Sequence, residues 1–173
     1  MRTLSSRALS AFYDQDGDEQ VITLLKIYGA NLSAPIYLAD GWTKRHESLS
    51  TDDDVVYGVT SDGADYLFLP FQISLPGEED GAGPRCNLTI QNATGVITPE
   101  IRALTSPPSV RVQVVIANSD TTVSTPEMEF DGFKLAGISY NAETVTGYLT
   151  VDGLSLEPFP SHTMTPSVCP GLF

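Results

Sequence analysis

Three aspartates near the N-terminus, Asp14, Asp16 and Asp18, have the spacing of the first three ligands of a calcium-binding loop. Such a loop needs a glycine directly after the third ligand and a bidentate glutamate at its twelfth position. The glycine is instead Gly17, and the twelfth position is Leu25, whose side chain carries no oxygen. We therefore expect a solvated break after a helix here, and no metal site.

Histidine, the usual proton carrier at neutral pH, occurs only twice. His46 lies among charged residues, so we expect it on the exposed face of a strand. His162 lies in a proline-rich segment, where we expect a structural or exposed role. No Gly-x-Ser-x-Gly elbow, Walker loop, His-Glu-x-x-His or Cys-x-x-Cys motif occurs. The sequence thus predicts no catalytic residue and no enzyme, with a small hydrolase of unrecognised site as the least favoured alternative.

The two cysteines, Cys86 and Cys169, are far apart in the sequence and match neither a disulfide framework nor a zinc site. We expect both to be reduced, small and buried, while a bond between them stays open. Two cysteines are too few to hold an iron–sulfur cluster alone. The sequence therefore predicts no metal and no cofactor.

Strand patterns dominate from Val21 onward, in roughly nine or ten segments. Residues 21–28, VITLLKIY, are almost all apolar, as in a buried strand, whereas apolar and polar residues alternate in 86–91. Residues 110–116 are a further clear strand. The other strand-like segments are 36–38, 42–46, 55–60, 66–75, 128–130, 133–140, 145–151 and 154–156.

Turn and capping residues set the order of these segments. Asp62-Gly63 between two apolar runs predicts a hairpin, and Pro70 inside the second run indicates an edge position or a bulge. Ser5 or Ser6 would cap a first short helix that ends near Tyr13, with Ala8, Leu9 and Phe12 as its apolar face. Thr98 and Pro99 would open a second helix, with Ile101 and Leu104 on its apolar side.

The 173 residues, of which 41% are hydrophobic and 18% charged, suit a single domain over 1–173. No internal repeat or long linker divides the chain. Strands spaced by about 8–12 residues are typical of all-β architectures. The predicted fold is mainly β with two short helices, arranged as a β-sandwich or split barrel.

The chain carries 9 basic and 22 acidic residues, a net charge of −13. A groove that holds nucleic acid needs the opposite sign, because phosphate neutralisation drives that binding. The same charge disfavours anionic membranes, and no apolar run has the length that a bilayer requires. We therefore expect no specific nucleic-acid binding and no membrane insertion.

Residues 158–173, PFPSHTMTPSVCPGLF, combine four prolines with an apolar tip on a very acidic chain. Proline continues neither a helix nor a central strand, so we expect an extended C-terminal arm over 158–173. Either the rest of the domain or a neighbouring subunit would bury it. The predicted interface residues are Pro166, Cys169, Pro170, Gly171, Leu172 and Phe173.

The order of these features resembles a phage domain family of unknown function encoded among the tail genes of siphophages, over about residues 20–173. That family has a strand with a mid-strand Pro-Phe pair, a strand ending in Asn, a short helix, and a C-terminus like Phe-Pro…Thr-Pro…Phe-Pro-Gly-Leu-Phe. Cys169 stands where the family has an aromatic residue. The matching segments are 68–71, 88–92, 98–104, Phe159-Pro160, Thr165-Pro166 and 169–173.

The middle of the chain also resembles the first domain of the minor tail protein that forms the tail-tip hub of lambda-like phages. This implies a β-rich fold related to tail-tube subunits, in a structural protein of the virion at the distal end of the tail. The implied partners are the tube or distal-tail ring, the central receptor-binding protein, the tape measure and further copies of the chain. A trimer, the favoured state, fits a hub, and a hexamer fits a distal ring. DNA would pass the acidic wall only in transit.

The alternative to a tail component is a carbohydrate-binding β-sandwich for host attachment. Trp42, Tyr37 and Tyr57 would form its stacking platform. The competing explanation places these three aromatic residues in the core or in a subunit interface.

Overall fold

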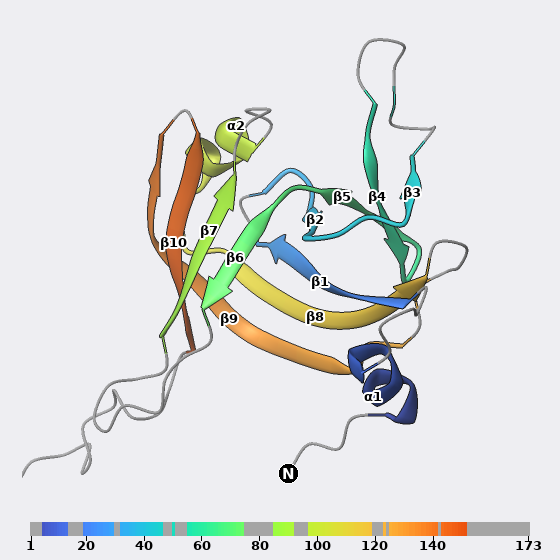
Figure 1. Cartoon of the computed structure of the whole chain (residues 1–173). Helices are drawn as coiled ribbons and strands as arrows, with labels where there is room; N and C mark the ends of the chain where they lie inside the picture. The colour runs from blue at the N-terminus through green and yellow to red at the C-terminus, as the bar shows by residue number, and fades with distance from the viewer. Residues whose placement is uncertain are drawn as a thin grey trace, which may run out of the picture.

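The computed structural model describes residues 5–13, 19–29, 32–46, 50, 55–74, 85–91, 97–118, 123, 125–141 and 143–151. Over these ranges the chain forms ten strands and two short helices (Figure 1). The helices are α1 (Ser6–Tyr13) and α2 (Ile97–Ala103). The strands are β1 (Glu19–Tyr28), β2 (Ile36–Ala39), β3 (Lys44–Arg45), β4 (Tyr57–Ser61), β5 (Ala64–Phe68), β6 (Phe71–Ser74), β7 (Arg85–Gln91), β8 (Ser109–Asn118), β9 (Met128–Tyr140) and β10 (Thr144–Val151). The prediction of a mainly β fold with two short helices is confirmed.

All ten strands belong to one sheet, in the order β3-β4-β5-β2-β1-β8-β9-β10-β7-β6. Every neighbouring pair is antiparallel except β2 with β5. The sheet is strongly curved, and β6, β7 and β10 pass across one side of β1 and β8 (Figure 1). The ladder has two ends, β3 and β6, so the sheet is not closed into a barrel.

The segment around Pro70 connects two separate parts of the curved sheet. The predicted strand 66–75 is divided at Leu69-Pro70 into β5 and β6. These two strands belong to different halves of the sheet, because β5 pairs with β2 and β6 pairs with β7. The Leu69 N–H donates to the Ala39 carbonyl, at 3.0 Å, and the Pro70 carbonyl accepts from the Gln91 N–H, at 2.9 Å. Proline lacks an N–H for a central ladder, and Pro70 lies outside both strands, directly before the edge strand β6.

Strand β9 bends the sheet through two bulges. Between Val110 and Val112 of β8, two β9 residues, Asp131 and Gly132, oppose a single partner residue. Gly137 lies at the second irregularity, opposite Gly147 of β10. Both β9 glycines have positive φ, 84° and 60°, as bulges often require. The sequence patterns 128–130 and 133–140 predicted two short strands with a turn between them, and that prediction is wrong.

The curved sheet encloses one hydrophobic cluster and carries a second on its opposite face. Leu25 and Ile27 of β1 face the enclosed cluster with Leu88, Leu149 and the α2 residue Ile101. On the opposite face, Ile22 and Leu24 pack with residues of β2, β4, β5 and β8. Strand β1 is therefore buried on both sides, as its apolar sequence predicted.

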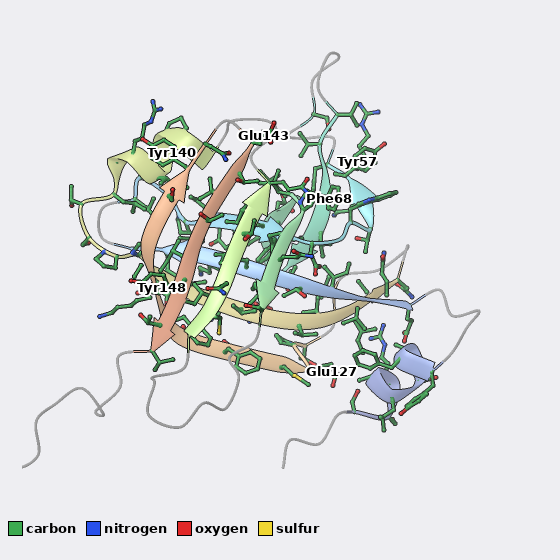
Figure 2. All side chains as sticks on the ribbon, turned by 60° about the vertical axis from the view of Figure 1, so that its left-hand side comes forward. Tyr57, Phe68, Glu127, Tyr140, Glu143 and Tyr148 are labelled. Carbon is green, nitrogen blue, oxygen red and sulfur yellow. The ribbon has the colours of Figure 1, made fainter. Side chains whose placement is uncertain are left out.

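Helix α1 buries less than the sequence suggested. Ser5 caps α1 as predicted, since the Ala8 N–H donates to the Ser5 hydroxyl at 3.1 Å. The Ser5 hydroxyl also donates to the Glu127 carboxylate at 2.6 Å, which joins α1 to the start of β9 (Figure 2). Only Ala8 is buried on α1, while Leu9 and Phe12 are exposed. No helix in the described ranges is long and apolar enough to cross a membrane.

Candidate interaction surfaces

Polar side chains with catalytic potential are dispersed across the described residues. No three His, Cys, Asp or Glu residues gather there in a metal-binding group. Cys86 is a free, buried thiol of β7, and burial raises its pKa. A thiol held in its protonated form is a poor nucleophile, so Cys86 fits the packing role that the sequence suggested. The acidic segment with Asp14, Asp16 and Asp18, His162 and Cys169 lie outside the described residues.

His46 is buried, which contradicts the prediction of an exposed strand residue. Its exposed fraction is 4%, and its Nδ1 lies 3.6 Å from the Asp65 Oδ1. Its Nε2 has no hydrogen-bond partner among the described residues. Gly58 on the neighbouring strand leaves room for the ring, because a β-carbon there would lie 2.9 Å from the imidazole. The side chain fills a gap beside β4, whereas the preceding Arg45 is exposed.

Two exposed aromatic rings lie together beside that hairpin. Trp42 and Tyr57 have ring centroids 4.9 Å apart, and 49% and 40% of these residues are exposed. Tyr37 does not join them, because it packs against Tyr66 on the second cluster, with centroids 5.1 Å apart. The predicted platform of three aromatic residues is therefore wrong as a set, and a pair remains. The exposed Lys44 of β3 follows Trp42 by two residues in the sequence.

A polar network crosses the face of β1, β8 and β9. The Arg111 guanidinium donates to the Asp131 carboxylate at 2.6 Å and lies 3.3 Å from that of Glu129. The Tyr28 hydroxyl donates to the same Asp131 at 3.0 Å. The Arg111 hydrogen bond, followed by one from the Gly132 N–H, holds the pKa of Asp131 below its usual value. The network ties the first β9 bulge to two central strands.

Replacement of Asp131 with asparagine is expected to destabilise the fold at neutral pH and to lose that effect in acid. The folded-state pKa is depressed, so the carboxylate stabilises the fold above its unfolded pKa of about 3.9, and less as pH falls through the folded pKa. Because 42% of the side chain is exposed, we expect a loss of less than about 1 kcal/mol at pH 7. Urea unfolding at pH 7 and pH 2, with Glu143→Gln as the exposed control, measures it. A loss that is equal at both pH values would contradict this account.

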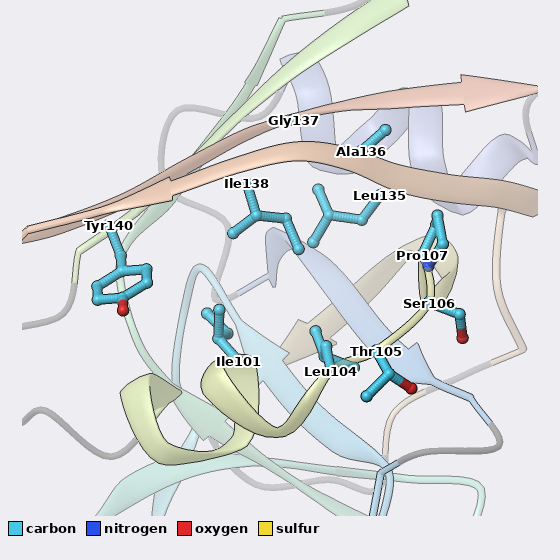
Figure 3. A pocket seen from close by; sticks show the side chains of 10 residues that line it. All are labelled: Ile101, Leu104, Thr105, Ser106, Pro107, Leu135, Ala136, Gly137, Ile138 and Tyr140. Carbon is cyan, nitrogen blue, oxygen red and sulfur yellow. The ribbon is translucent and has the colours of Figure 1, made fainter.

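An apolar groove lies between α2 and the second half of β9, with a volume of about 370 Å³. Ile101 and Leu104 form one wall, and Leu135 and Ile138 of β9 face them from the other (Figure 3). At one end, Arg102 contacts Tyr140 in two ways. Its Nε–H donates to the Tyr140 hydroxyl at 3.3 Å, and its guanidinium carbon lies 5.3 Å from the centroid of the Tyr140 ring. The residues Thr105, Ser106 and Pro107 line the other end.

The groove runs along a strand edge. The pairing of β9 with β8 ends at Lys134, and the Leu135 N–H donates to the Pro108 carbonyl at 2.9 Å. Beyond that point, residues 136–140 pair with β10 on one side. Within the part of the chain that the structure describes, no strand pairs with their other side. An apolar floor beside an unpaired edge is the arrangement that accepts an added strand.

The predicted interface residues Pro166, Cys169, Pro170, Gly171, Leu172 and Phe173 lie outside the described residues. Sequence reasoning missed the groove, because its walls come from α2, the segment after it, and β9, more than thirty positions further on. The apolar residues Ile101 and Leu104 were its one signal. The pattern placed them on the hydrophobic side of a helix, and of the two only Ile101 is buried.

Comparison with known proteins places the chain in a family defined by sequence. The family described as "Domain of unknown function (DUF1833)" matches residues 7–164. This range includes all ten strands and α2. No curated protein matches the chain.

Proposed function

This chain belongs to the DUF1833 family, whose description names no function, and we propose that it is a structural component of a siphophage tail tip or baseplate. As a hub or distal-tail adaptor, it joins the tail tube to the central receptor-binding assembly and lines the DNA channel. Its place is the distal end of the tail in the virion.

The observation that carries the proposal is the pattern of the C-terminal arm, Phe159-Pro160, Thr165-Pro166 and 169–173, behind a strand-rich domain. The geometry of the described residues supports an assembling role. The sheet has two open ends, β3 and β6, and unpaired edges are hidden when subunits close into a ring. The exposed Phe12 and Tyr13 of α1 add apolar surface that a neighbour would cover.

The proposed assembly is a homo-oligomer, with a trimer favoured for a hub and a hexamer for a distal ring. Its other partners are the tube or distal ring, the receptor-binding protein and the tape measure. A net charge of −13 suits an inner wall that repels DNA in transit. A structure of the assembly in which the acidic residues lie on the outer face and the channel is neutral or basic would contradict the proposed acidic inner wall.

Immunogold labelling of tailed particles tests the function directly. An antibody against this chain is expected to place gold at the tail end distal to the capsid. The control is the same antibody on disrupted virions, which shows that the epitope is reachable. Absence of the chain from both intact and disrupted virions would overturn the proposal.

The paired Trp42 and Tyr57 support a second candidate, a carbohydrate-binding module for host attachment. Two half-exposed rings 4.9 Å apart form a small surface for sugar stacking, although their tilt of 53° is not a flat platform. Binding to a glycan array that Trp42→Ala removes would favour this function. Gold at the tail tip without glycan binding would favour the structural one.

A further inference from the structure

We propose that the groove between α2 and β9 receives the segment Pro166–Phe173 of a second copy of this chain, as a strand added to the free edge of β9. The proposal rests on the homo-oligomer of the proposed function. It specifies which surface of one subunit holds the arm of the next.

The arm has the pattern of an added strand with one apolar face. In an extended segment alternate side chains share a face, so Pro166, Val168, Pro170 and Leu172 lie on one side. All four are apolar, and they match a floor made by Ile101, Leu104 and Ile138. The other side carries Ser167, Cys169, Gly171 and Phe173, a mixture of small residues and one ring.

The spacing of Pro166 and Pro170 is compatible with hydrogen bonding between the arm and β9. In a strand, alternate N–H groups point to the same neighbour. Pro166 and Pro170 are four residues apart, so both can direct their missing N–H away from β9. The N–H groups of Ser167, Cys169 and Gly171 then face the unpaired edge at residues 136–140. A sequence with prolines at odd spacing would break this ladder.

Topology favours a neighbouring copy over the arm's own groove, and the chain is long enough to reach one. β10 ends at Val151, and the open edge lies on the side of β9 that faces away from β10. An arm folding back would have to cross β9 to reach it. The 15 positions from Val151 to Pro166 span up to about 50 Å when extended, which is enough to reach an adjacent subunit. Such a head-to-tail contact forms a ring where the rotation closes.

A disulfide between the arm and the groove tests the proposal. Thr105 is exposed on the groove rim, so Thr105→Cys places a thiol beside the proposed arm, whose natural Cys169 would lie on the side that faces away from the groove floor. The matched control is Ser10→Cys on the exposed side of α1, away from the groove. Cys86 is buried, and burial raises the pKa of its thiol, so we expect it not to react in this experiment. Both full-length variants are treated with an added disulfide oxidant and separated on non-reducing gels, and circular dichroism checks that each is folded.

We expect Thr105→Cys to form intermolecular disulfides roughly tenfold or more faster than Ser10→Cys, because docking raises the local concentration of the two thiols. A ladder that ends at three or six chains would also give the ring size. Adding Leu172→Asp, on the apolar face, should abolish the ladder, whereas Ser167→Asp, on the other face, should keep it.

An intramolecular disulfide, equal reaction of both cysteine variants, or no reaction of either would overturn the proposal. The immunogold result is independent of these outcomes. Gold at the tail tip without the Thr105→Cys ladder would leave the proposed function standing and place the arm elsewhere.

Discussion

Gly58→Ala is expected to lower the free energy of unfolding by about 3 kcal/mol or more, the largest effect of any single glycine replacement in the β4–β5 hairpin. A β-carbon at Gly58 would clash with the Tyr66 carbonyl oxygen and lie 2.9 Å from the buried His46 ring. The carbonyl belongs to the β4–β5 ladder and cannot rotate away as a side-chain tip can. The sheet must therefore separate or His46 must leave its site.

Gly63→Ala, in the turn of the same hairpin, is the matched control. Gly63 has a positive φ of 74°, but a β-carbon there would meet nothing within 4 Å. We expect only the cost of left-handed backbone, about 1 kcal/mol. Urea unfolding of both variants measures the difference. Equal losses would show that the contact with Tyr66 and His46 relaxes at little cost and would contradict this account of Gly58.

Local rules predicted only in part what happens at Pro70. A proline inside an apolar run indicated an edge or a bulge, whereas Pro70 lies between two strands and directly precedes the edge strand β6. The exchange of partners at this residue, from β2 to β7, depends on how far the sheet curves. That curvature is the sum of many side-chain contacts, and no local pattern records it.

Gly132 shows the reverse case, in which a correct local signal led to a wrong element. A glycine between two apolar runs is typical of turns, and it separated 128–130 from 133–140 in the prediction. The residue has the expected positive φ, but it forms a bulge within the single strand β9. Turns and bulges use the same backbone conformation, so only the pairing with β8 distinguishes them.

His46 was predicted on the surface because its sequence neighbours are charged. In the structure a glycine across the hairpin, Gly58, makes the space that it fills. The candidate groove is a similar case, since two short segments and β9 create it together. The arm, by contrast, stays a prediction, because it lies outside the described residues and rests on the proline spacing and apolar tip of one continuous segment.

Leu25→Ala is expected to lower the free energy of unfolding by about 2–5 kcal/mol, as for buried leucines elsewhere. Its side chain is fully buried in the cluster that the curved sheet encloses. The adjacent Leu24 is 1% exposed and faces the other cluster, on the opposite side of β1. We expect Leu24→Ala to lose a similar amount, whereas Val151→Ala, at a residue that is 42% exposed, should change stability by about 0.5 kcal/mol or less.

The shape of the unfolding curves carries the further test. Because β1 supplies side chains to both clusters, the two cannot unfold separately without breaking its central ladder with β8, which pairs all ten residues of the strand. Both leucine variants should therefore unfold in one transition, with the same denaturant dependence as the parent chain. Two transitions in Leu25→Ala would mean that the β6-β7-β10 part of the sheet folds independently of the β4-β5 part. A single shifted transition would establish that one cooperative domain presents the groove and both open edges.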